Sequence, residues 1–209
     1  MAIHTAYGLV CSDLSDDLSK TNLGELELDE FLNDSVQIKI KAASLNFPDL
    51  LMTRGMYQNK PNLPFALGME GSGIVEKIGK DVKDLKEGDE VMFGGWGHGA
   101  IATSIILPAA LVTLKPKSLT FSEAAAFKTV YLTAYVGLIR RGYLEREETL
   151  LVHGASGGVG MAAVQMGKLY GAEVIASGTS DEKLSIVKSW GADHVINTGL
   201  EGSVEFREK

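Results

Sequence analysis

The stretch Leu150-Leu-Val-His-Gly-Ala-Ser-Gly-Gly-Val-Gly160 decides the fold of this chain. Residues 149–153 form a short aliphatic run, the pattern expected of a strand buried on both faces. A turn of small residues follows, and a helical pattern begins at Met161. A glycine-rich turn between a strand and a helix is typical of a dinucleotide site, because it lets a pyrophosphate approach the unpaired amides of the helix N-terminus.

The glycine spacing departs from the G-x-G-x-x-G pattern at one position. Ala155 takes the first glycine position, and Gly157 and Gly160 take the other two. Such turns also serve plain packing, so the turn alone is a weak indication. A second aliphatic strand at 173–177, about 20 residues further on, favours the nucleotide interpretation. We therefore expect the pyrophosphate at the turn. Its expected contacts are Ser156, Gly157, Gly158 and Val159.

Composition excludes several classes of protein. The chain has 209 residues, a length that suits one large or two modest domains. Its net charge is −7 with scattered basic residues, which argues against nucleic acid or an anionic membrane as the main partner. Cys11 is the single cysteine, so an internal disulfide or a cysteine-based zinc cluster is excluded. With no signal peptide or membrane span recognisable, we expect a cytoplasmic protein.

Residues 1–121 are rich in short strands and turns. Strands are expected at 36–42, 71–79, 86–93, 100–107 and 111–114. A polar loop is expected over 16–23 and a short helix after Pro48. Many short strands with glycine turns predict a barrel or sandwich. We therefore assign residues 1–121 to a first domain.

Residues 122–209 alternate helix and strand. A helix is expected from Ser122, as N-cap, to Arg141, with Gly142 as its stop. Strands at 149–153, 173–177 and 194–197 then alternate with helices, which predicts a parallel, doubly wound sheet. A complete dinucleotide fold has two βαβαβ halves, and this sequence supplies one. This predicts a fragment, a truncated product, or a fold completed by a partner.

The end of the second strand bears on the choice between NADH and NADPH. Proteins that bind NADH carry Asp or Glu at this position. Here the strand ends in Ser177, Gly178 and Thr179 follow, and Lys183 lies in the next helix. Small hydroxyls and a lysine near a helix N-terminus favour a 2′-phosphate, and hence NADPH. Two observations oppose this. Residues 179–182 also fit a capping box with Lys183 merely solvated, and Asp181 and Glu182 lie close by.

The sequence resembles the zinc-free quinone oxidoreductase branch of the medium-chain dehydrogenase/reductase superfamily over about residues 36–197. The matching motifs are Asn46-Phe-Pro-Asp49, Arg54-Gly-Met-Tyr57, Leu63-Pro-Phe-Ala-Leu-Gly-Met-Glu-Gly-Ser-Gly73, Gly88-Asp-Glu-Val91, Thr133-Ala-Tyr135 and Val152-His-Gly-Ala-Ser-Gly-Gly-Val-Gly160. The resemblance implies a GroES-like β-barrel domain followed by a Rossmann domain. It also implies that Ala155 is normal at the first glycine position.

Metal binding is not expected. Zinc relatives in this superfamily carry a cysteine where Asn46 stands and Gly-His-Glu where Gly68-Met-Glu70 stands. Catalytic zinc would therefore lose two of its three usual protein ligands. The histidines do not cluster in the sequence and are each explained more simply as structural. They are His4, His98, His153 and His194.

Without a metal, hydride transfer to a conjugated acceptor such as a quinone, an enone or an enoyl thioester is expected. The resemblance implies Tyr57 as proton donor or substrate-orienting hydroxyl, Asn46 near the nicotinamide, and Thr133 at the nicotinamide end. Tyr57 can also be read as an aromatic that covers apolar surface. Leu51 and Thr198 stand where some relatives carry tyrosines. The resemblance therefore predicts substrate choice and cofactor affinity less closely.

The leading hypothesis is a zinc-independent, NADPH-dependent oxidoreductase acting on a quinone or enone. An enoyl-thioester or alkenal reductase with the same machinery is the alternative within the enzyme class. A truncated, non-catalytic product that binds nucleotide, or a partner protein without turnover, is the alternative outside it. Relatives often dimerise through the far edge of the Rossmann sheet, so a homodimer is a hypothesis for a full-length form only.

Overall fold

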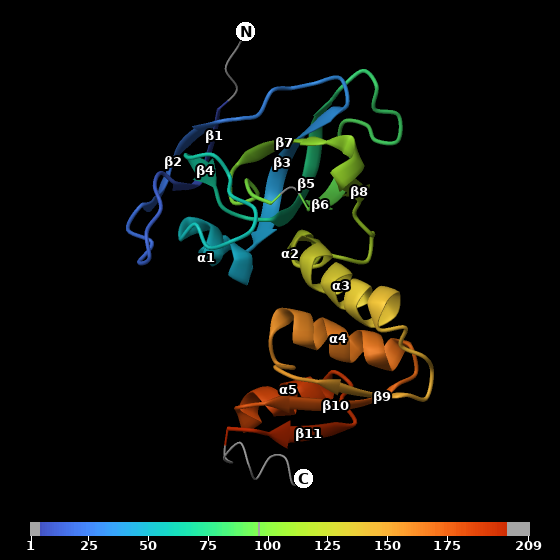
Figure 1. Ribbon diagram of the computed structural model, residues 1–209. Coiled ribbons are helices and arrows are strands. Elements are labelled where there is room, and N and C mark those ends of the chain that lie inside the picture. The colour runs from blue at the N-terminus through green and yellow to red at the C-terminus, as the bar shows by residue number, and fades with distance from the viewer. Residues whose placement is uncertain (1–4, 96, 200–209) are drawn as a thin grey trace. The chain divides into compact units, whose positions relative to one another are not determined.

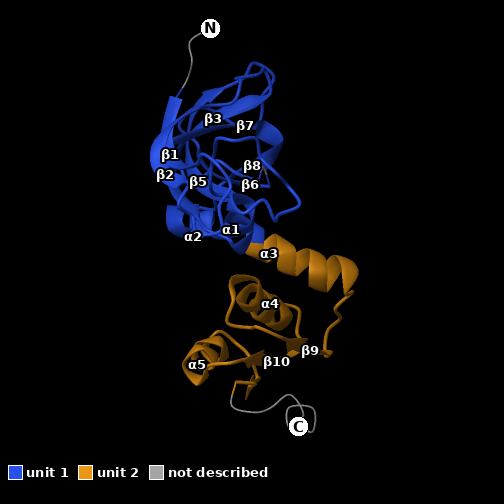
Figure 2. Cartoon of the chain, turned by 60° about the vertical axis from the view of Figure 1, so that its left-hand side comes forward, with its two compact units in different colours: residues 1–129 blue, residues 130–209 orange. Residues whose placement is uncertain are grey.

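The structure of the protein is a computed structural model, and it describes residues 5–95 and 97–199 (Figure 1). The expectations for His4 and for residues 200–209 lie outside this range. The chain divides into two compact units, Met1–Thr129 and Val130–Lys209 (Figure 2). Within the described ranges, no helix has the length and apolar character that crossing a membrane requires.

Unit 1 is built from two antiparallel sheets. The larger has the strand order β7-β3-β5-β6-β8, and the smaller has the order β2-β1-β4. The strands are β1 Thr5–Cys11, β2 Thr21–Glu27, β3 Ser35–Ser44, β4 Phe65–Ala66, β5 Glu70–Ile78, β6 Glu90–Gly94, β7 Ser104–Pro108 and β8 Val112–Leu114. Gly8 of β1 also forms an isolated bridge with Ala102, which lies just before β7 and outside both sheets. Over the described residues the strands therefore form two sheets rather than one closed barrel.

The cores of unit 1 follow the alternation of apolar residues along its strands. Side chains two residues apart point to the same face, so Val36 and Ile38 of β3 lie in one core with Val91 and Phe93 of β6. A second, smaller core contains Cys11, Met52, Phe65 and Leu67. This core anchors α1, Phe47–Thr53, through Met52. The short helix expected after Pro48 is thus confirmed, and it begins one residue before the proline.

The expected loop over 16–23 is partly wrong, because β2 begins at Thr21. This strand pairs with β1 over its whole length, from Thr21 opposite Cys11 to Glu27 opposite Thr5. Its side chains are exposed or half-buried throughout. An edge strand with little burial carries polar residues, so local composition alone cannot distinguish it from a loop.

The helical region begins earlier than expected. Helix α2 spans Phe121–Ala125, and its N-cap is Thr120 rather than Ser122. Thr120 and Glu123 form a capping box in which the Thr120 hydroxyl accepts the Glu123 N–H at 3.2 Å and the Glu123 carboxylate accepts the Thr120 N–H at 2.8 Å. The second bond needs a carboxylate three residues after the cap, which Ser122 lacks.

The rest of this region follows the expected course. Helix α3 spans Lys128–Tyr135, and a π-helical turn, η2, covers Val136–Arg141 before the chain leaves the helix at Gly142. A short 3-10 helix, η1, spans Ala109–Leu111. Gly142 is therefore the stop that the sequence indicates.

Unit 1 extends to Thr129, eight residues beyond the expected boundary at 121. Three hydrogen bonds tie residues 121–129 to the rest of unit 1. The Ser72 hydroxyl donates to the Phe121 carbonyl at 2.6 Å, and the Lys128 ammonium donates to the Leu111 carbonyl at 3.0 Å. The Thr129 N–H donates to Glu70 Oε2 at 2.7 Å. Helix α2 thus packs as part of the first unit.

Unit 2 contains the expected parallel sheet, with the order β11-β10-β9. The strands are β9 Thr149–Val152, β10 Glu173–Gly178 and β11 His194–Asn197, and the helices are α4 Gly158–Leu169 and α5 Asp181–Ser189. Strand and helix alternate as the sequence indicates. Helix α4 begins at Gly158, three residues before the apolar pattern becomes visible, because its first turn consists of glycine and valine.

Strand β9 was expected to be buried on both faces, and this is wrong for the described chain. Leu150 packs against α4 at Gly167, but Leu151 on the opposite face is 47 % exposed. Within the described residues β9 pairs only with β10 and forms the edge of the sheet. A parallel strand is buried on both faces only where helices cover both, and α5 contacts β10 and β11 instead.

Candidate functional site

The glycine-rich turn is held against the end of β10. Gly154 has a φ of +62°, which a glycine adopts without strain. The next amide, of Ala155, donates to the Ser177 carbonyl at 3.0 Å, and the Ala155 side chain is fully buried in the unit 2 core. The positive φ falls on Gly154, so the first position of the motif accepts alanine.

The close approach in this turn falls on Gly160. A Cβ at this position would lie 2.4 Å from the Gly154 carbonyl oxygen and 2.7 Å from Ala155 Cα. Both are backbone atoms that cannot move aside. Gly160 therefore allows the first turn of α4 to pack directly on the loop that follows β9.

The start of α4 is open to an anion. Gly157 is the N-cap, and no side chain caps the helix. The first amides of a helix lack intrahelical acceptors and carry the positive end of the dipole. The four predicted pyrophosphate contacts, Ser156 to Val159, are all exposed. The structure thus brings them together at an uncapped helix N-terminus.

The predicted 2′-phosphate residues differ in exposure. Ser177 is 2 % exposed, and its hydroxyl lies 2.8 Å from Nδ1 of His153. Gly178 is half-buried, and its carbonyl accepts the Thr198 N–H at 2.8 Å. Thr179 and Lys183 are exposed. A phosphate arriving from solvent can therefore reach Thr179 and Lys183 directly.

Helix α5 is capped by Ser180, not by Thr179. The Ser180 hydroxyl accepts the Lys183 N–H at 3.4 Å. The capping box proposed for residues 179–182 is therefore wrong, and the Thr179 hydroxyl is not used as the cap. Asp181 accepts a hydrogen bond from the Asn197 amide at 2.7 Å, which occupies one of its carboxylate oxygens.

In unit 1, Asn46 lies beside a buried carboxylate. Glu70 is 1 % exposed, and its Oε1 atom accepts from the Ser44 hydroxyl at 2.7 Å and from Asn46 Nδ2 at 3.0 Å. Asn46 Nδ2 also lies 3.2 Å from Ser44 Oγ. The other oxygen, Oε2, accepts the Thr129 N–H. These contacts satisfy a charge that would otherwise be costly to bury.

A second buried carboxylate fixes the backbone on both sides of this network. Asp49 is 1 % exposed and accepts the N–H groups of Asn46 and Gly68, each at 2.8 Å. Burial raises the pKa of Asp49, the two N–H donors oppose this, and the charge of Glu70 adds to it. Burial lowers the pKa of Lys128, and Glu70 opposes this shift.

Tyr57 and Thr133 lie in different units. Tyr57 follows α1 in unit 1, and its half-buried ring packs against the small core around Met52. Thr133 is an exposed residue of α3 in unit 2. The packing of Tyr57 is what both readings of this residue require, since a proton donor also needs its ring held in place.

Sequence reasoning missed the part that Glu70 plays. In the sequence, Glu70 stands out only as the last residue of the Gly68-Met-Glu70 segment, and no motif includes Ser44, Lys128 or Thr129. One signal was available, because Glu70 is an acidic residue that opens a strand of glycine and aliphatic residues, Glu70-Gly-Ser-Gly-Ile-Val75. A charge in such a run requires buried partners.

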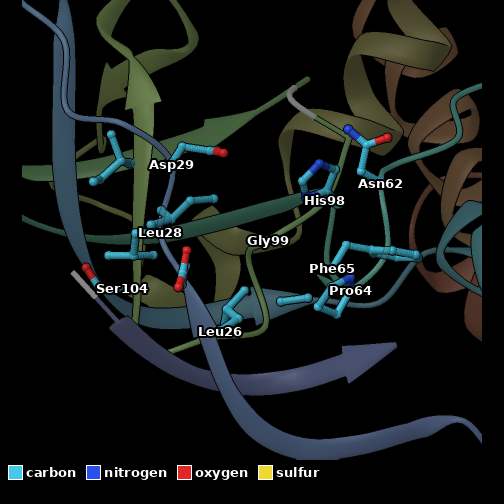
Figure 3. Close-up of a pocket in the computed structure, with 13 residues that line it drawn as sticks. Leu26, Leu28, Asp29, Asn62, Pro64, Phe65, His98, Gly99 and Ser104 are labelled. Atoms are coloured by element: carbon cyan, nitrogen blue, oxygen red, sulfur yellow. The ribbon is translucent and has the colours of Figure 1, made fainter. Parts of the chain in front are cut away.

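A pocket of about 220 Å³ in unit 1 contains none of the predicted site residues (Figure 3). Leu26, Asp29, Asn62, Phe65 and His98 are among the residues that line it. The His98 and Phe65 ring centres are 5.9 Å apart. Burial lowers the pKa of His98, and Asp29 opposes this shift.

Metal ligands do not gather in the described part of the chain. Among residues 5–95 and 97–199, no group of three or more histidine, cysteine, aspartate or glutamate side chains is arranged to hold a metal ion. Asn46 and Met69 stand at the two positions that matter most for zinc. Asn46 donates to Glu70, and Met69 packs against the small apolar core.

Comparison with known proteins assigns each unit to a family. Residues 33–117 match the family described as the alcohol dehydrogenase GroES-like domain, and residues 158–208 match the family described as zinc-binding dehydrogenase. These two domains occur in the same order as the two units of the structure.

Similar proteins include two curated relatives. A rat protein named synaptic vesicle membrane protein VAT-1 homolog is 38 % identical over 166 residues, covering 78 % of this chain and 40 % of the relative. A tomato (Solanum lycopersicum) protein named 2-methylene-furan-3-one reductase is 38 % identical over 186 residues, covering 84 % of this chain and 48 % of the relative. The chain thus spans about half the length of these relatives.

A solved structure has the same fold. The Escherichia coli quinone oxidoreductase complexed with NADPH matches with a TM-score of 0.84 and 31 % identity, covering 97 % of this chain and 61 % of that one. The order of the two domains, the glycine-rich turn and these similarities agree with one another. The chain belongs to the medium-chain dehydrogenase/reductase superfamily, in its quinone oxidoreductase branch.

Proposed function

We propose that this chain provides the catalytic domain and the first half of the nucleotide-binding domain of a zinc-independent, NADPH-dependent oxidoreductase acting on a quinone or another conjugated carbonyl. The observation that carries the proposal is the uncapped, exposed start of α4, where Gly160 lets the helix pack against the backbone of the preceding turn. A Cβ at this glycine would close the turn against its own backbone.

The residues present fit a dinucleotide. In the proposal, Ser156, Gly157, Gly158 and Val159 hold the pyrophosphate through amides at the start of α4. Asn46 and Thr133 serve the nicotinamide end, and Gly178 lines the adenosine side. Bound NADPH would supply the hydride. The role of the chain is to bind, orient and exclude water around it.

The preference for NADPH rests on the residues after β10. The strand ends without a carboxylate, and Thr179 and Lys183 are exposed at the start of α5. Lys183 offers a cation and Thr179 a hydroxyl to a 2′-phosphate. Ser177 supports this site indirectly, because its hydroxyl holds the ring of His153 through a hydrogen bond. The Asp181 carboxylate accepts a hydrogen bond from Asn197 of β11, so one of the two nearby acidic groups is bound to that strand.

Zinc independence is supported by the chemistry of the donor set. Asn46 presents an amide and Met69 a thioether where zinc relatives have a thiolate and an imidazole. An amide whose nitrogen donates to Glu70 and a methionine packed in an apolar core are poor zinc ligands. In the proposal, the site therefore works without a zinc ion that polarises the carbonyl group of the acceptor.

A conjugated acceptor needs a hydride at one end and a proton at the other. In the proposal the Tyr57 hydroxyl delivers or relays the proton to the acceptor and is reprotonated from solvent. A quinone, NADPH and one proton then give a hydroquinone and NADP⁺. The ring of Tyr57 is half-buried against Met52, which limits the positions that its hydroxyl can take.

Two alternatives are tested beside this proposal. Reduction of an alkenal or enoyl thioester would use the same residues, and the tomato relative carries the name of a reductase of a conjugated ketone. A nucleotide-binding product without turnover is the alternative outside the enzyme class. The single cysteine, Cys11, is buried, which suits the cytoplasm. A homodimer remains a hypothesis for a longer form.

The test has two stages. NADPH and NADH are first titrated into the chain, and tighter binding of NADPH is expected, while binding of neither would overturn the proposal. NADPH oxidation with 1,4-benzoquinone and with an enone is then measured for this chain and for a form extended to the length of the relatives. Turnover only in the extended form would favour the non-catalytic reading of this chain. Faster turnover of an alkenal or an enoyl thioester than of either of these acceptors would favour the alternative reductase.

A further inference from the structure

The first turn of α4 has little rigidity of its own. Its residues are Gly158, Val159 and Gly160, and no side chain caps it. Glycine loses more backbone freedom than any other residue when a helix fixes it, and valine is a weaker helix former than alanine. The amides at this helix start therefore need contacts from outside the helix to stay in place.

One such contact comes from α3. A Cβ added at Gly158 would lie 3.0 Å from Val130 Cγ1, and outside its own helix and chain neighbours it would meet no other described atom within 4 Å. This position of α4 therefore points at Val130. The dinucleotide motif does not call for glycine here, since the position is one of its variable ones. Gly158 remains exposed, so the contact leaves its backbone open to a ligand.

A hydrogen bond holds the same two helices together. The Tyr131 hydroxyl donates to Gln165 Oε1, which joins α3 to α4 inside unit 2 (Figure 2). Gln165 lies seven residues after Gly158, about two turns further along the same face of the helix. Tyr131 follows Val130 directly. The hydrogen bond thus fixes the place at which Val130 meets the first turn of α4.

We propose that Tyr131 and Gln165 are positioning residues of the nucleotide site, which keep Val130 in contact with Gly158 and so hold the start of α4 ready for a pyrophosphate. The identity of the ligand rests on the proposed function. The two side chains act through Val130 and do not touch the nucleotide. Donors that are already in place bind an anion more tightly, because less ordering is left for the binding step. All four residues belong to unit 2.

The first experiment exchanges the two contacting groups. G158A adds a methyl group against Val130 and should raise the NADPH dissociation constant about tenfold, whereas V130A alone should raise it about threefold. In the double variant the new methyl group takes up the space that V130A vacates, so affinity should return to within about twofold of the unmutated chain. V136A, at an exposed valine of η2, is the matched control and should bind normally. An equal loss from G158A with and without V130A would overturn the role of Val130.

The second experiment tests the hydrogen bond with a conservative rescue. Q165M removes the acceptor at similar size and should raise the NADPH dissociation constant about fivefold, whereas Q165E keeps an acceptor and should bind like the unmutated chain. Y131F should match Q165M, and the two together should lose no more than either alone. Y170F, at the other end of α4, is the control. A Q165E chain as weak as Q165M would overturn the assignment.

Two further readouts separate positioning from a general loss of stability. The Met161 N–H donates to the Gly157 carbonyl at 2.8 Å and closes the first turn of α4, and the Tyr170 N–H donates to the Met166 carbonyl at 2.9 Å at the far end. In Q165M the Met161 N–H should exchange about fivefold faster, and the Tyr170 N–H should not change. Adenosine 2′-monophosphate lacks the diphosphate, so Q165M should bind it normally. Equal losses for both ligands, or faster exchange at both ends, would overturn the positioning role.

Failure of this proposal can be told apart from failure of the proposed function. If the unmutated chain binds no NADPH, the proposed function fails. The exchange rate of the Met161 N–H in Q165M and the coupling of G158A with V130A in urea midpoints then still decide whether α3 holds the start of α4. If NADPH binds and Q165M changes neither its affinity nor this exchange rate, only the role of Tyr131 and Gln165 is overturned.

Discussion

The Ser177 hydroxyl lies 2.8 Å from Nδ1 of His153, and this contact joins the ends of two neighbouring parallel strands. Val152 and Ala176 form the last pair between β9 and β10, and His153 and Ser177 follow them directly. His153 is exposed, whereas Ser177 is 2 % exposed. The residue that the sequence offers to the 2′-phosphate therefore serves first to fix the corner where the glycine-rich turn begins.

Replacing Ser177 by alanine should affect stability more than nucleotide selectivity. The lost hydrogen bond should lower the free energy of unfolding by about 1 kcal/mol, measured by urea denaturation. The ratio of NADPH to NADH affinity should change little. Ser189→Ala, at the exposed end of α5, is the control and should be close to neutral. A selective loss of NADPH affinity in Ser177→Ala would show direct contact with the phosphate.

Removing the Lys183 ammonium should weaken NADPH and spare NADH. Lys183→Ala deletes the exposed cation in the first turn of α5, and we expect NADPH to bind roughly fivefold more weakly. Lys188→Ala removes a cation from the last turn of the same helix and should leave both affinities unchanged. Equal losses for NADH and NADPH in Lys183→Ala would contradict a phosphate contact. Fluorescence titration measures both affinities.

A methyl group at Gly160 should disrupt the turn. The Cβ would lie 2.4 Å from the Gly154 carbonyl oxygen, and the backbone must shift to relieve this overlap. Gly160→Ala should therefore destabilise the protein by about 2 kcal/mol or more and abolish nucleotide binding. At Gly137 an added Cβ meets no atom within 4 Å, so Gly137→Ala is the matched control and should be neutral or slightly stabilising. Wild-type affinity in Gly160→Ala would show that nucleotide binding does not depend on the packing of α4 against this turn.

Stability should fall as the pH drops below the ordinary histidine range, and His98 should contribute to the fall. Burial lowers the pKa of His98 in the folded protein below its ordinary value of about 6.5. Between these two pKa values the unfolded chain binds the proton and the folded chain does not. The contribution of His98 is therefore complete above pH 6.5 and is lost as the pH falls through the folded pKa.

The measurement compares urea midpoints at about pH 7.5 and 5.5 for the unmutated chain, His98→Asn and His194→Asn. His98→Asn should reduce the pH dependence of the midpoint. His194 is largely exposed, with 61 % of its side chain accessible, and replacing it provides the comparison. An unchanged pH dependence in His98→Asn would contradict the burial of this imidazole.

The exposed face of β9 should promote self-association. Leu151 is 47 % exposed on a strand that forms the edge of the described unit 2 sheet. Leu151→Lys should lower concentration-dependent association, seen by sedimentation velocity, because a lysine on an edge strand opposes pairing. Leu169 is more exposed, at 81 %, but lies at the end of α4. If Leu169→Lys reduced association equally, general apolar exposure rather than the strand edge would be responsible.

Much of the fold was readable from local patterns. The strand, turn and helix around Gly157, the alternation of strand and helix after it, and the helix after Asn46 all depend on residues close together in the sequence. The motifs that carry the resemblance are also local. The edge strand β2 and the Thr120 cap were misread, since polar residues are common to edge strands, caps and loops.

The sequence by itself determined the family and the groups available for chemistry. These groups are a glycine-rich turn, a strand end without a carboxylate, and an asparagine where a zinc ligand would stand. Tertiary structure decided which of these groups are accessible and how they are held. Glu70 meets Asn46 and Thr129 across 24 and 59 residues of chain, and Ser177 meets His153 across 24. No local periodicity encodes such contacts, because folding brings those segments together only when the sheets that carry them have formed.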